Sequence, residues 1–299
     1  MSYPRHGSPN LQMDWCTSSG QSIPDAPAEV FLVLSGLNFQ PNALRALAGL
    51  VMAQGAGTAL GLPYGYFDIP GTTGQPDPRQ WLAGTGEAVQ HLRHRYPSAR
   101  ISLLGFSLGG LVGLSWGLEA AITTGFRWHR AVLVAPGICP RWCNRALINW
   151  LGDRIPGHWR LPGLTPPGYR MHRFTPVGTY RSVLKLSQDF QQQLASMNPA
   201  QLTQGLPPQF IAYSPRDELV SARYLRSYGQ RFPKLVTLHR VGHFSYPWRF
   251  HHLATGPEAI GPGEWEALGH ALRQWMGLHE QPEKQAMAAG KTAESIGPG

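Results

Sequence analysis

Short apolar runs alternate with longer amphipathic segments along most of the chain. Bounded apolar runs of this length are typical of buried strands, and they occupy residues 29–35, 58–62, 100–104, 130–135, 209–213 and 234–239. Apolar positions at helical spacing follow most of these runs, in the segments 42–53, 79–96, 108–124, 221–231 and 263–277. This alternation predicts an α/β fold, in which a mostly parallel central sheet is joined by right-handed crossovers and flanked by helices on both faces.

The alternation breaks once, between the strands predicted at 130–135 and 209–213. Residues 138–205 contain seven prolines, several aromatic residues and two candidate helices, at 141–151 and 179–196. An insertion that follows a strand is well placed to cover the carboxyl ends of the sheet, where open α/β sheets bind ligands. The sequence therefore predicts an inserted lid at 138–205.

This division leaves a predicted core of residues 29–137 and 206–278, a size that fits one large domain with an insertion. The segment 1–28 is polar and rich in Pro, Ser and Gly, and we expect at most a short edge hairpin there. Residues 279–299 lack apolar periodicity, which is typical of a disordered tail.

Composition and charge narrow the classes of partner. The 299 residues carry a net charge of +9, and nearly all of the positive charge is arginine because only four lysines are present. The arginines are scattered and no nucleic-acid-binding motif accompanies them, so we expect no nucleic-acid partner, although a basic surface permits transient contact with a membrane surface. The chain has no apolar run long enough for a membrane-spanning helix and no secretory signal core, so the expected location is cytoplasmic. No pattern indicates an oligomeric state.

The cysteines argue against a disulfide framework and against a metal site. Cys16, Cys139 and Cys143 are few and odd in number, as expected in a reducing compartment. Cys139 and Cys143 lie four residues apart, but no second Cys/His pair at metal-ligand spacing accompanies them. We therefore predict no metal and no organic cofactor.

A Gly-x-Ser-x-Gly pattern occurs twice, around Ser107 (GFSLG) and around Ser115 (GLSWG). A nucleophile on such a turn needs a strand directly before it and a helix directly after it, so that the hydroxyl is lifted clear of the backbone. Ser107 has the predicted strand 100–104 before it and the predicted helix 108–124 after it. Ser115 lies two turns inside that helix, where its hydroxyl is expected to bond a preceding carbonyl. Ser107 is therefore the candidate nucleophile.

A serine hydroxyl becomes a good nucleophile only when a positioned base removes its proton. In folds that carry such a turn, the chain order is serine, then acid, then histidine. Asp217 follows the strand predicted at 209–213, and His243 follows the strand predicted at 234–239. We predict that Asp217 orients the imidazole of His243, which takes the proton of Ser107.

Other acidic residues and histidines compete for these roles. Glu218 is the alternative acid, but the shorter aspartate directly after Ser-Pro-Arg fits a tight turn better. His239 lies four residues before His243, which on a helix would suggest paired metal ligands, but His239 is predicted within a strand. His251 and His252 follow an aromatic run and are expected to make surface or lid contacts.

The remaining site residues follow from the needs of an acyl-transfer reaction. An oxyanion hole requires two backbone N–H donors, and we expect them from Leu108, after the nucleophile, and from Leu37, in the loop after the first strand. Phe106, Phe244 and Trp248 are the expected substrate contacts. The aromatic residues of the lid could also line an apolar acyl pocket, although packing of the lid on the core is the favoured role for any single one of them; they are Trp142, Trp150, Trp159, Tyr169 and Phe174.

These segments together resemble the α/β-hydrolase superfamily over roughly residues 29–137 and 206–278. The elbow GFSLGG, the segment SPRDELVS and the segment VGHF stand in the order expected for a serine esterase of that superfamily. Within it the chain is similar to carboxylesterases, lysophospholipases and monoacylglycerol-lipase-like enzymes, which carry a helical lid. One departure concerns the oxyanion loop, where such enzymes usually have His-Gly and this chain has Ser35-Gly36. The backbone donor can survive that change, but its supporting hydrogen bonds must differ.

The resemblance and the residues together predict a serine hydrolase that cleaves a small-molecule carboxylic ester of an acyl substrate through an acyl-enzyme on Ser107. Two alternatives stay open. An acyltransferase or thioesterase would use the same residues with another acceptor or leaving group. A non-catalytic binding protein could also have this fold, although it would usually lack one of the three residues, and Ser35 is its main support.

Overall fold

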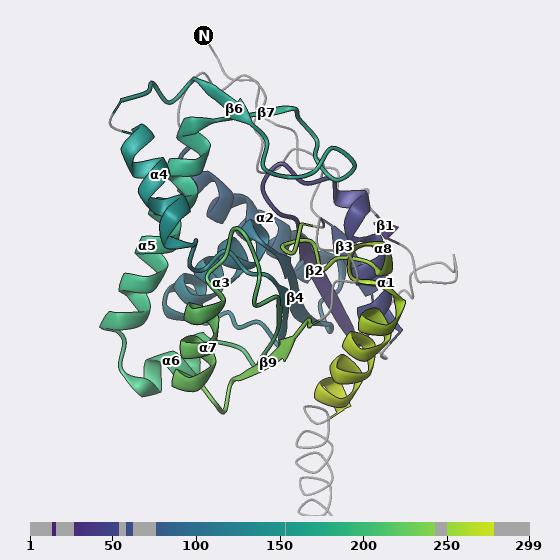
Figure 1. Cartoon of the computed structure of the whole chain (residues 1–299). Helices are drawn as coiled ribbons and strands as arrows, with labels where there is room; N and C mark the ends of the chain where they lie inside the picture. Colours follow the sequence, from purple (N-terminus) through teal and green to yellow (C-terminus); the bar gives the residue numbers. More distant parts are fainter. Residues whose placement is uncertain are drawn as a thin grey trace, which may run out of the picture.

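The computed structural model describes residues 14–15, 27–53, 58–61, 76–152, 154–242 and 250–277. Its centre is a sheet of seven strands in the order β1-β3-β2-β4-β5-β8-β9 (Figure 1). All neighbours pair in parallel except β1, which is antiparallel to β3. The strand bounds are β1 Asp14–Trp15, β2 Glu29–Leu34, β3 Thr58–Gly61, β4 Arg100–Phe106, β5 Ala131–Val134, β8 Gln209–Tyr213 and β9 Val236–Arg240.

Helices cover both faces of the sheet, because its central strands are apolar on both sides. In β2, Val30 and Leu32 pack into the core that contains α2 and α3, whereas Phe31 and Val33 pack into the core that contains α1 and the helix at 262–277. The helices are α1 Arg45–Met52, preceded by the 3₁₀ helix η1 Pro41–Leu44, then α2 Pro78–Arg95, α3 Leu108–Thr123, α7 Ala222–Arg231 and α8 Pro257–Ile260. The predicted fold class and all six strands predicted from apolar runs are confirmed.

The segment between β5 and β8 leaves the sheet and forms structure of its own. It contains α4 Trp142–Gly152, the antiparallel pair β6 Arg160–Pro162 and β7 Phe174–Pro176, α5 Val177–Ser196 and α6 Pro199–Gly205. Figure 1 shows α4 and the β6–β7 pair at one end of the molecule, beyond the sheet. The periodicity predicted α4 and α5 but not β6, β7 or α6, because these elements are short and contain prolines that a sequence pattern reads as loop.

A buried ion pair ties the amino ends of the central strands together. Glu29 begins β2, and its carboxylate accepts hydrogen bonds from Arg130 Nε at 2.8 Å and from the Ser102 hydroxyl of β4. Both charged side chains are almost fully buried. Since breaking a buried pair leaves an uncompensated charge, the pair fixes the relative placement of the strands whose opposite ends carry the site described next.

Candidate active site

Ser107 lies at a sharp turn between β4 and α3. Its backbone angles, φ 51° and ψ −117°, are unusual for a residue with a side chain and are typical of the strained elbow that exposes a hydroxyl. A Cβ on Gly109 would lie 2.1 Å from the carbonyl oxygen of Leu34, so only glycine lets α3 approach the end of β2 this closely. The Ser107 N–H donates to Val134 O at 3.0 Å, and its carbonyl accepts from Gly137 N at 2.8 Å. Neighbouring segments therefore hold the elbow on both sides.

Ser115, the centre of the second motif, lies inside α3 and is 5% exposed. Its position in the helix is as predicted. The expected hydrogen bond to a preceding carbonyl is wrong, since its hydroxyl has no hydrogen-bond partner among the described residues. Ser115 is a packing residue.

The histidine that contacts Ser107 is His252. Its Nε2 lies 2.8 Å from Ser107 Oγ, and its Nδ1 lies 2.9 Å from Asp217 Oδ2 and 3.1 Å from Oδ1. The imidazole thus bridges the hydroxyl and the carboxylate, which is the position that the sequence assigned to His243. His243 itself lies outside the described residues, which omit 243–249.

This is a correction with a simple physical reason. The prediction took the first histidine after the last strand, whereas the imidazole that contacts Ser107 among the described residues belongs to the turn of residues 251–252. His251 and His252 were expected to make surface or lid contacts. A surface position is wrong, because they are 8% and 3% exposed, and their imidazoles contact Glu218 and Asp217. One feature of the sequence could have indicated His252 as the histidine of this site. The chain has two adjacent acids, Asp217 and Glu218, and later two adjacent histidines, His251 and His252.

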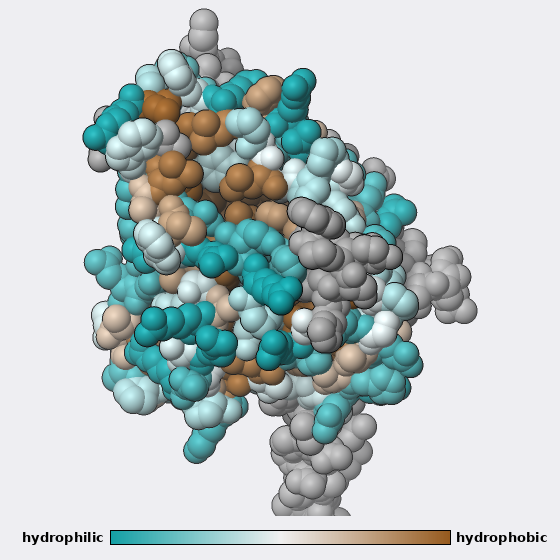
Figure 2. Space-filling model, in the orientation of Figure 1, coloured by the Kyte–Doolittle hydropathy of each residue, from teal (hydrophilic) through white to brown (hydrophobic). Residues whose placement is uncertain are grey.

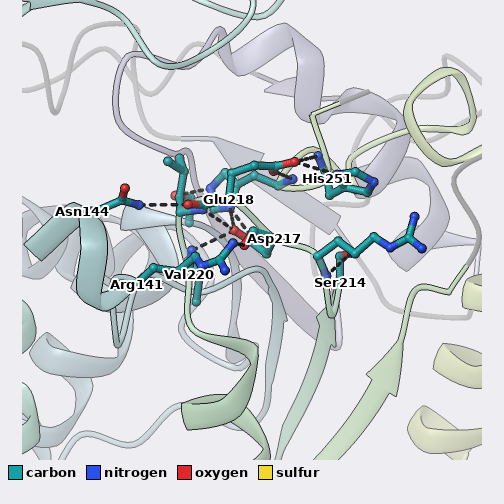
Figure 3. A network of polar contacts seen from close by, with 11 residues as sticks. Arg141, Asn144, Ser214, Asp217, Glu218, Val220 and His251 are labelled. Atoms are coloured by element: carbon teal, nitrogen blue, oxygen red, sulfur yellow. Dashed lines mark hydrogen bonds and ion pairs between the residues drawn. The ribbon is translucent and has the colours of Figure 1, made fainter. Parts of the chain in front are cut away.

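Asp217 is held in a tight turn after β8. Its Oδ1 accepts from the N–H groups of Leu219 and Val220, both at 2.8 Å, and the residue is 3% exposed. Its carbonyl accepts from Arg141 Nη1 at 3.1 Å, at the start of the inserted segment. Figure 3 shows this turn between Arg141 and Asn144 on one side and His251 on the other. Of the two adjacent acids, Asp217 is the one whose carboxylate contacts the imidazole of His252.

The two expected oxyanion donors lie next to Ser107. Leu108 is the first residue of α3, where an N–H has no partner within the helix. Gly36, directly before Leu37, is so close to the elbow that a Cβ there would lie 3.2 Å from Ser107 Cβ. Leu37 and Leu108 both line the cavity that contains Ser107. The arrangement can receive a negative charge that develops on a carbonyl oxygen bound beside Ser107.

Asn38, which the sequence reasoning missed, supports this loop. The residue is 3% exposed and has φ 50°, which asparagine tolerates better than most residues. Its amide nitrogen donates to His172 O at 2.7 Å and to Thr175 Oγ1 at 3.1 Å, and its amide oxygen accepts from His172 N at 2.7 Å. The inserted segment therefore provides support for a loop that begins Ser35-Gly36 in place of His-Gly.

A narrow apolar cavity of about 100 Å³ opens beside the Ser107 hydroxyl. Phe106, an expected substrate contact, lines it, while Phe244 and Trp248 lie outside the described residues. The inserted segment contributes aliphatic residues and one tyrosine to the wall, namely Ile148, Leu164, Tyr180, Val183 and Leu184.

The aromatic residues expected to line this cavity lie elsewhere. Trp142, Trp150, Trp159 and Phe174 are 79%, 55%, 57% and 42% exposed and are absent from the cavity wall. Tyr169 stacks on Phe39 with ring centroids 6.0 Å apart. The expectation was wrong because hydrophobicity alone does not tell which face of the inserted segment turns inward.

The buried Cys139 thiol is not an alternative nucleophile. Burial raises the pKa of the Cys139 thiol, which keeps it in the unreactive protonated form. Within the described ranges, no cluster of three or more His, Cys, Asp or Glu side chains could hold a metal ion. None of the helices in the described part of the chain has the length and apolar character that a membrane span needs.

The model of the Alpha/beta hydrolase family matches residues 22–260. The chain therefore belongs to this family.

Solved structures of lipolytic enzymes share the fold. A structure of the metagenome-derived lipolytic enzymes LipS and LipT has a TM-score of 0.57 at 18% identity, covering 85% of this chain and 100% of that one. A soluble variant of the monoglyceride lipase of Saccharomyces cerevisiae has a TM-score of 0.63 at 11% identity, covering 89% and 90%. The monoacylglycerol lipase of Paleococcus ferrophilus has a TM-score of 0.60 at 16% identity, covering 84% and 96%. No curated protein sequence matches the chain.

Proposed function

We propose that this protein is a serine hydrolase that cleaves carboxylic esters of apolar acyl groups. The observation that carries the proposal is the continuous chain of contacts from Ser107 Oγ through His252 to the Asp217 carboxylate, at 2.8 and 2.9 Å. Membership of the α/β-hydrolase family and the fold shared with lipolytic enzymes support ester hydrolysis as the general reaction.

The proposed reaction proceeds in two halves. Ser107 Oγ attacks the acyl carbonyl while His252 Nε2 takes its proton, and Asp217 stabilises the resulting imidazolium through Nδ1. The N–H groups of Leu37 and Leu108 receive the negative charge of the tetrahedral intermediate. His252 then gives the proton to the leaving alcohol, and an acyl-enzyme remains on Ser107. In the second half His252 takes a proton from a water molecule that attacks the acyl carbon, and it returns this proton to Ser107 Oγ as the bond to the acyl group breaks and the acid leaves.

The outer surface of the inserted segment favours a lipophilic substrate. Apolar residues gather over α4 and around a hollow on the face shown in Figure 2. Arginines lie among the exposed rings, with Arg154 4.9 Å from the Trp150 ring and Arg173 5.3 Å from the Phe174 ring. Exposed aromatic and cationic side chains together are typical of surfaces that meet anionic lipid headgroups. We propose transient contact of this surface with a membrane that supplies the ester.

Ester hydrolysis can be tested directly on the purified protein. In a panel of p-nitrophenyl esters of increasing acyl length, we expect kcat/KM to rise from acetyl to medium chains, because the cavity beside Ser107 is apolar. A long-chain ester should turn over faster in anionic than in neutral vesicles. Higher activity on thioesters, or acyl transfer to added alcohols in preference to water, would assign the acyltransferase or thioesterase alternative. No turnover of any ester or thioester, together with no fluorophosphonate labelling, would contradict the proposal.

Asn38→Ala tests whether the inserted segment supports the oxyanion loop. The change removes both amide contacts and leaves His172 N without its acceptor, so we expect kcat/KM to fall about 10-fold and the free energy of unfolding to fall by about 1–3 kcal/mol. The matched control is Gln40→Ala, which removes another side-chain tie to the inserted segment, the 2.9 Å bond to Arg170 O. Ester hydrolysis and chemical unfolding are measured for both variants. An equal loss of kcat/KM in both would contradict a specific role for Asn38.

A further inference from the structure

A second acid–histidine pair lies directly beside the first. Glu218 and His251 are the chain neighbours of Asp217 and His252, and Glu218 Oε1 lies 2.6 Å from His251 Nδ1 (Figure 3). His251 is mostly buried, with 10% of its side chain exposed, whereas 35% of the Glu218 side chain is exposed. The proposed mechanism uses neither residue.

Glu218 also contacts the backbone of both histidines. Its Oε1 accepts from His251 N at 3.1 Å, and its Oε2 accepts from His252 N at 3.1 Å. Each carboxylate oxygen therefore binds a different N–H group, and the two groups belong to consecutive residues. Such charge-assisted hydrogen bonds are stronger than bonds between neutral groups.

These contacts matter because His252 lies on neither a helix nor a strand. It belongs to a turn, in which Leu253 N donates to Phe250 O and Ala254 N donates to His252 O, both at 3.2 Å. The orientation of the imidazole depends on where this turn sits relative to β4 and β8. Glu218 connects the turn to the loop that carries Asp217, so one loop holds both the side chain and the backbone of the same histidine.

The inserted segment holds the other side of this acid loop. Asn144 Nδ2 donates to Glu218 O at 2.9 Å, and Arg141 N donates to Leu219 O at 2.8 Å. The inserted segment therefore holds the acid loop by contacts that do not involve the histidine turn, and Glu218 connects this loop to the backbone of His252.

We propose that Glu218 is a positioning residue, whose carboxylate holds the backbone N–H groups of His251 and His252 so that the His252 imidazole spans Ser107 and Asp217. Glu218 is not a second orienting acid for His252, because the His252 Nδ1 contacts Asp217. The effect of Glu218 on the rate of ester hydrolysis rests on the proposed function, whereas its effect on the position of the His252 imidazole does not.

The test is Glu218→Gln. Glutamine has the same reach but only one acceptor oxygen, and its NH₂ group would face an N–H donor. We expect kcat for ester hydrolysis to fall about 10- to 100-fold, as for a catalytic group displaced by about 1 Å. KM should stay within about twofold of wild type and the thermal unfolding midpoint should hardly change, because the apolar cavity is untouched and the site is partly exposed. The control is Glu266→Gln, the same change on an exposed helix face, which should leave both values unaltered.

His251→Asn separates the backbone contacts from the side-chain contact. This variant loses the imidazole but keeps both N–H groups bound by Glu218, so its kcat should fall less than that of Glu218→Gln. An equal or greater loss would overturn the assignment to the backbone contacts. The assignment would equally be overturned by a Glu218→Gln variant with wild-type kcat, by one with raised KM and unchanged kcat, or by one whose unfolding midpoint falls by several degrees.

A spectroscopic readout keeps the test independent of activity. The Nδ1 proton of His252, bonded to Asp217, should give a low-field NMR resonance in the wild type and in Glu266→Gln, and Asp217→Asn should remove it. In Glu218→Gln we expect the resonance to broaden or disappear, and an unchanged resonance would overturn the proposal. A wild-type protein without esterase activity would refute the proposed function alone, because this resonance would still report where His252 sits.

Discussion

Replacing His252 with alanine is expected to lower kcat/KM for ester hydrolysis by about four to six orders of magnitude, as the loss of the base does in serine hydrolases. The reason is geometric: within the described residues, His252 is the imidazole that contacts both Ser107 Oγ and the Asp217 carboxylate. The matched control is His243→Ala, which removes the histidine favoured by sequence position and should retain kcat/KM within about threefold. Steady-state kinetics on one ester, with the unfolding midpoint of each variant, provides the measurement.

The two histidine variants discriminate between a prediction from spacing and one from structure. A large loss in His243→Ala with little loss in His252→Ala would return the base to His243. Large losses in both variants, at unchanged unfolding midpoints, would mean that the segment containing His243 also takes part in the reaction.

Ser107→Ala is expected to abolish covalent labelling by a fluorophosphonate and to lower kcat/KM by about 10⁴- to 10⁶-fold. The chain offers a matched control in Ser115→Ala, which alters the other Gly-x-Ser-x-Gly motif. Ser115 is buried in α3 and its hydroxyl has no described partner, so its loss should change neither labelling nor turnover and should shift the unfolding midpoint little. Mass spectrometry of the labelled peptide identifies the modified serine.

Undiminished labelling in Ser107→Ala would remove the proposed nucleophile. If wild type and both serine variants all failed to label and to hydrolyse esters, the contacts of Ser107, His252 and Asp217 would belong to a non-catalytic protein on the same fold. That outcome would also make the support of the oxyanion loop by Asn38 a structural feature alone.

The amino-acid sequence by itself determined the class of fold and the position of Ser107. Buried strands and amphipathic helices leave a local pattern, because side-chain spacing follows the geometry of each element. The elbow is equally local: β4, the turn and α3 are consecutive in the chain, and this context separated Ser107 from Ser115. The sequence also predicted Asp217, because this residue directly follows its strand.

Only the tertiary structure decided which histidine meets Ser107. His252 Nε2 and Ser107 Oγ belong to residues 145 positions apart, and their contact depends on the path of the chain after β9. Local periodicity does not predict contacts over such a separation, and spacing favoured His243. The carboxylate of Glu218, dismissed as a rival acid, holds the turn that carries His252.

The same reason applies to the inserted segment. Apolar periodicity in the sequence predicted its helices α4 and α5. Which residues face the cavity depends on how the segment packs against the sheet. Asn38 and His172 are 134 positions apart, and their hydrogen bonds could not be read from either residue alone. Local patterns specified the elements and the proposed nucleophile, whereas long-range packing selected the proposed base, the contacts of Asn38 and the wall of the cavity.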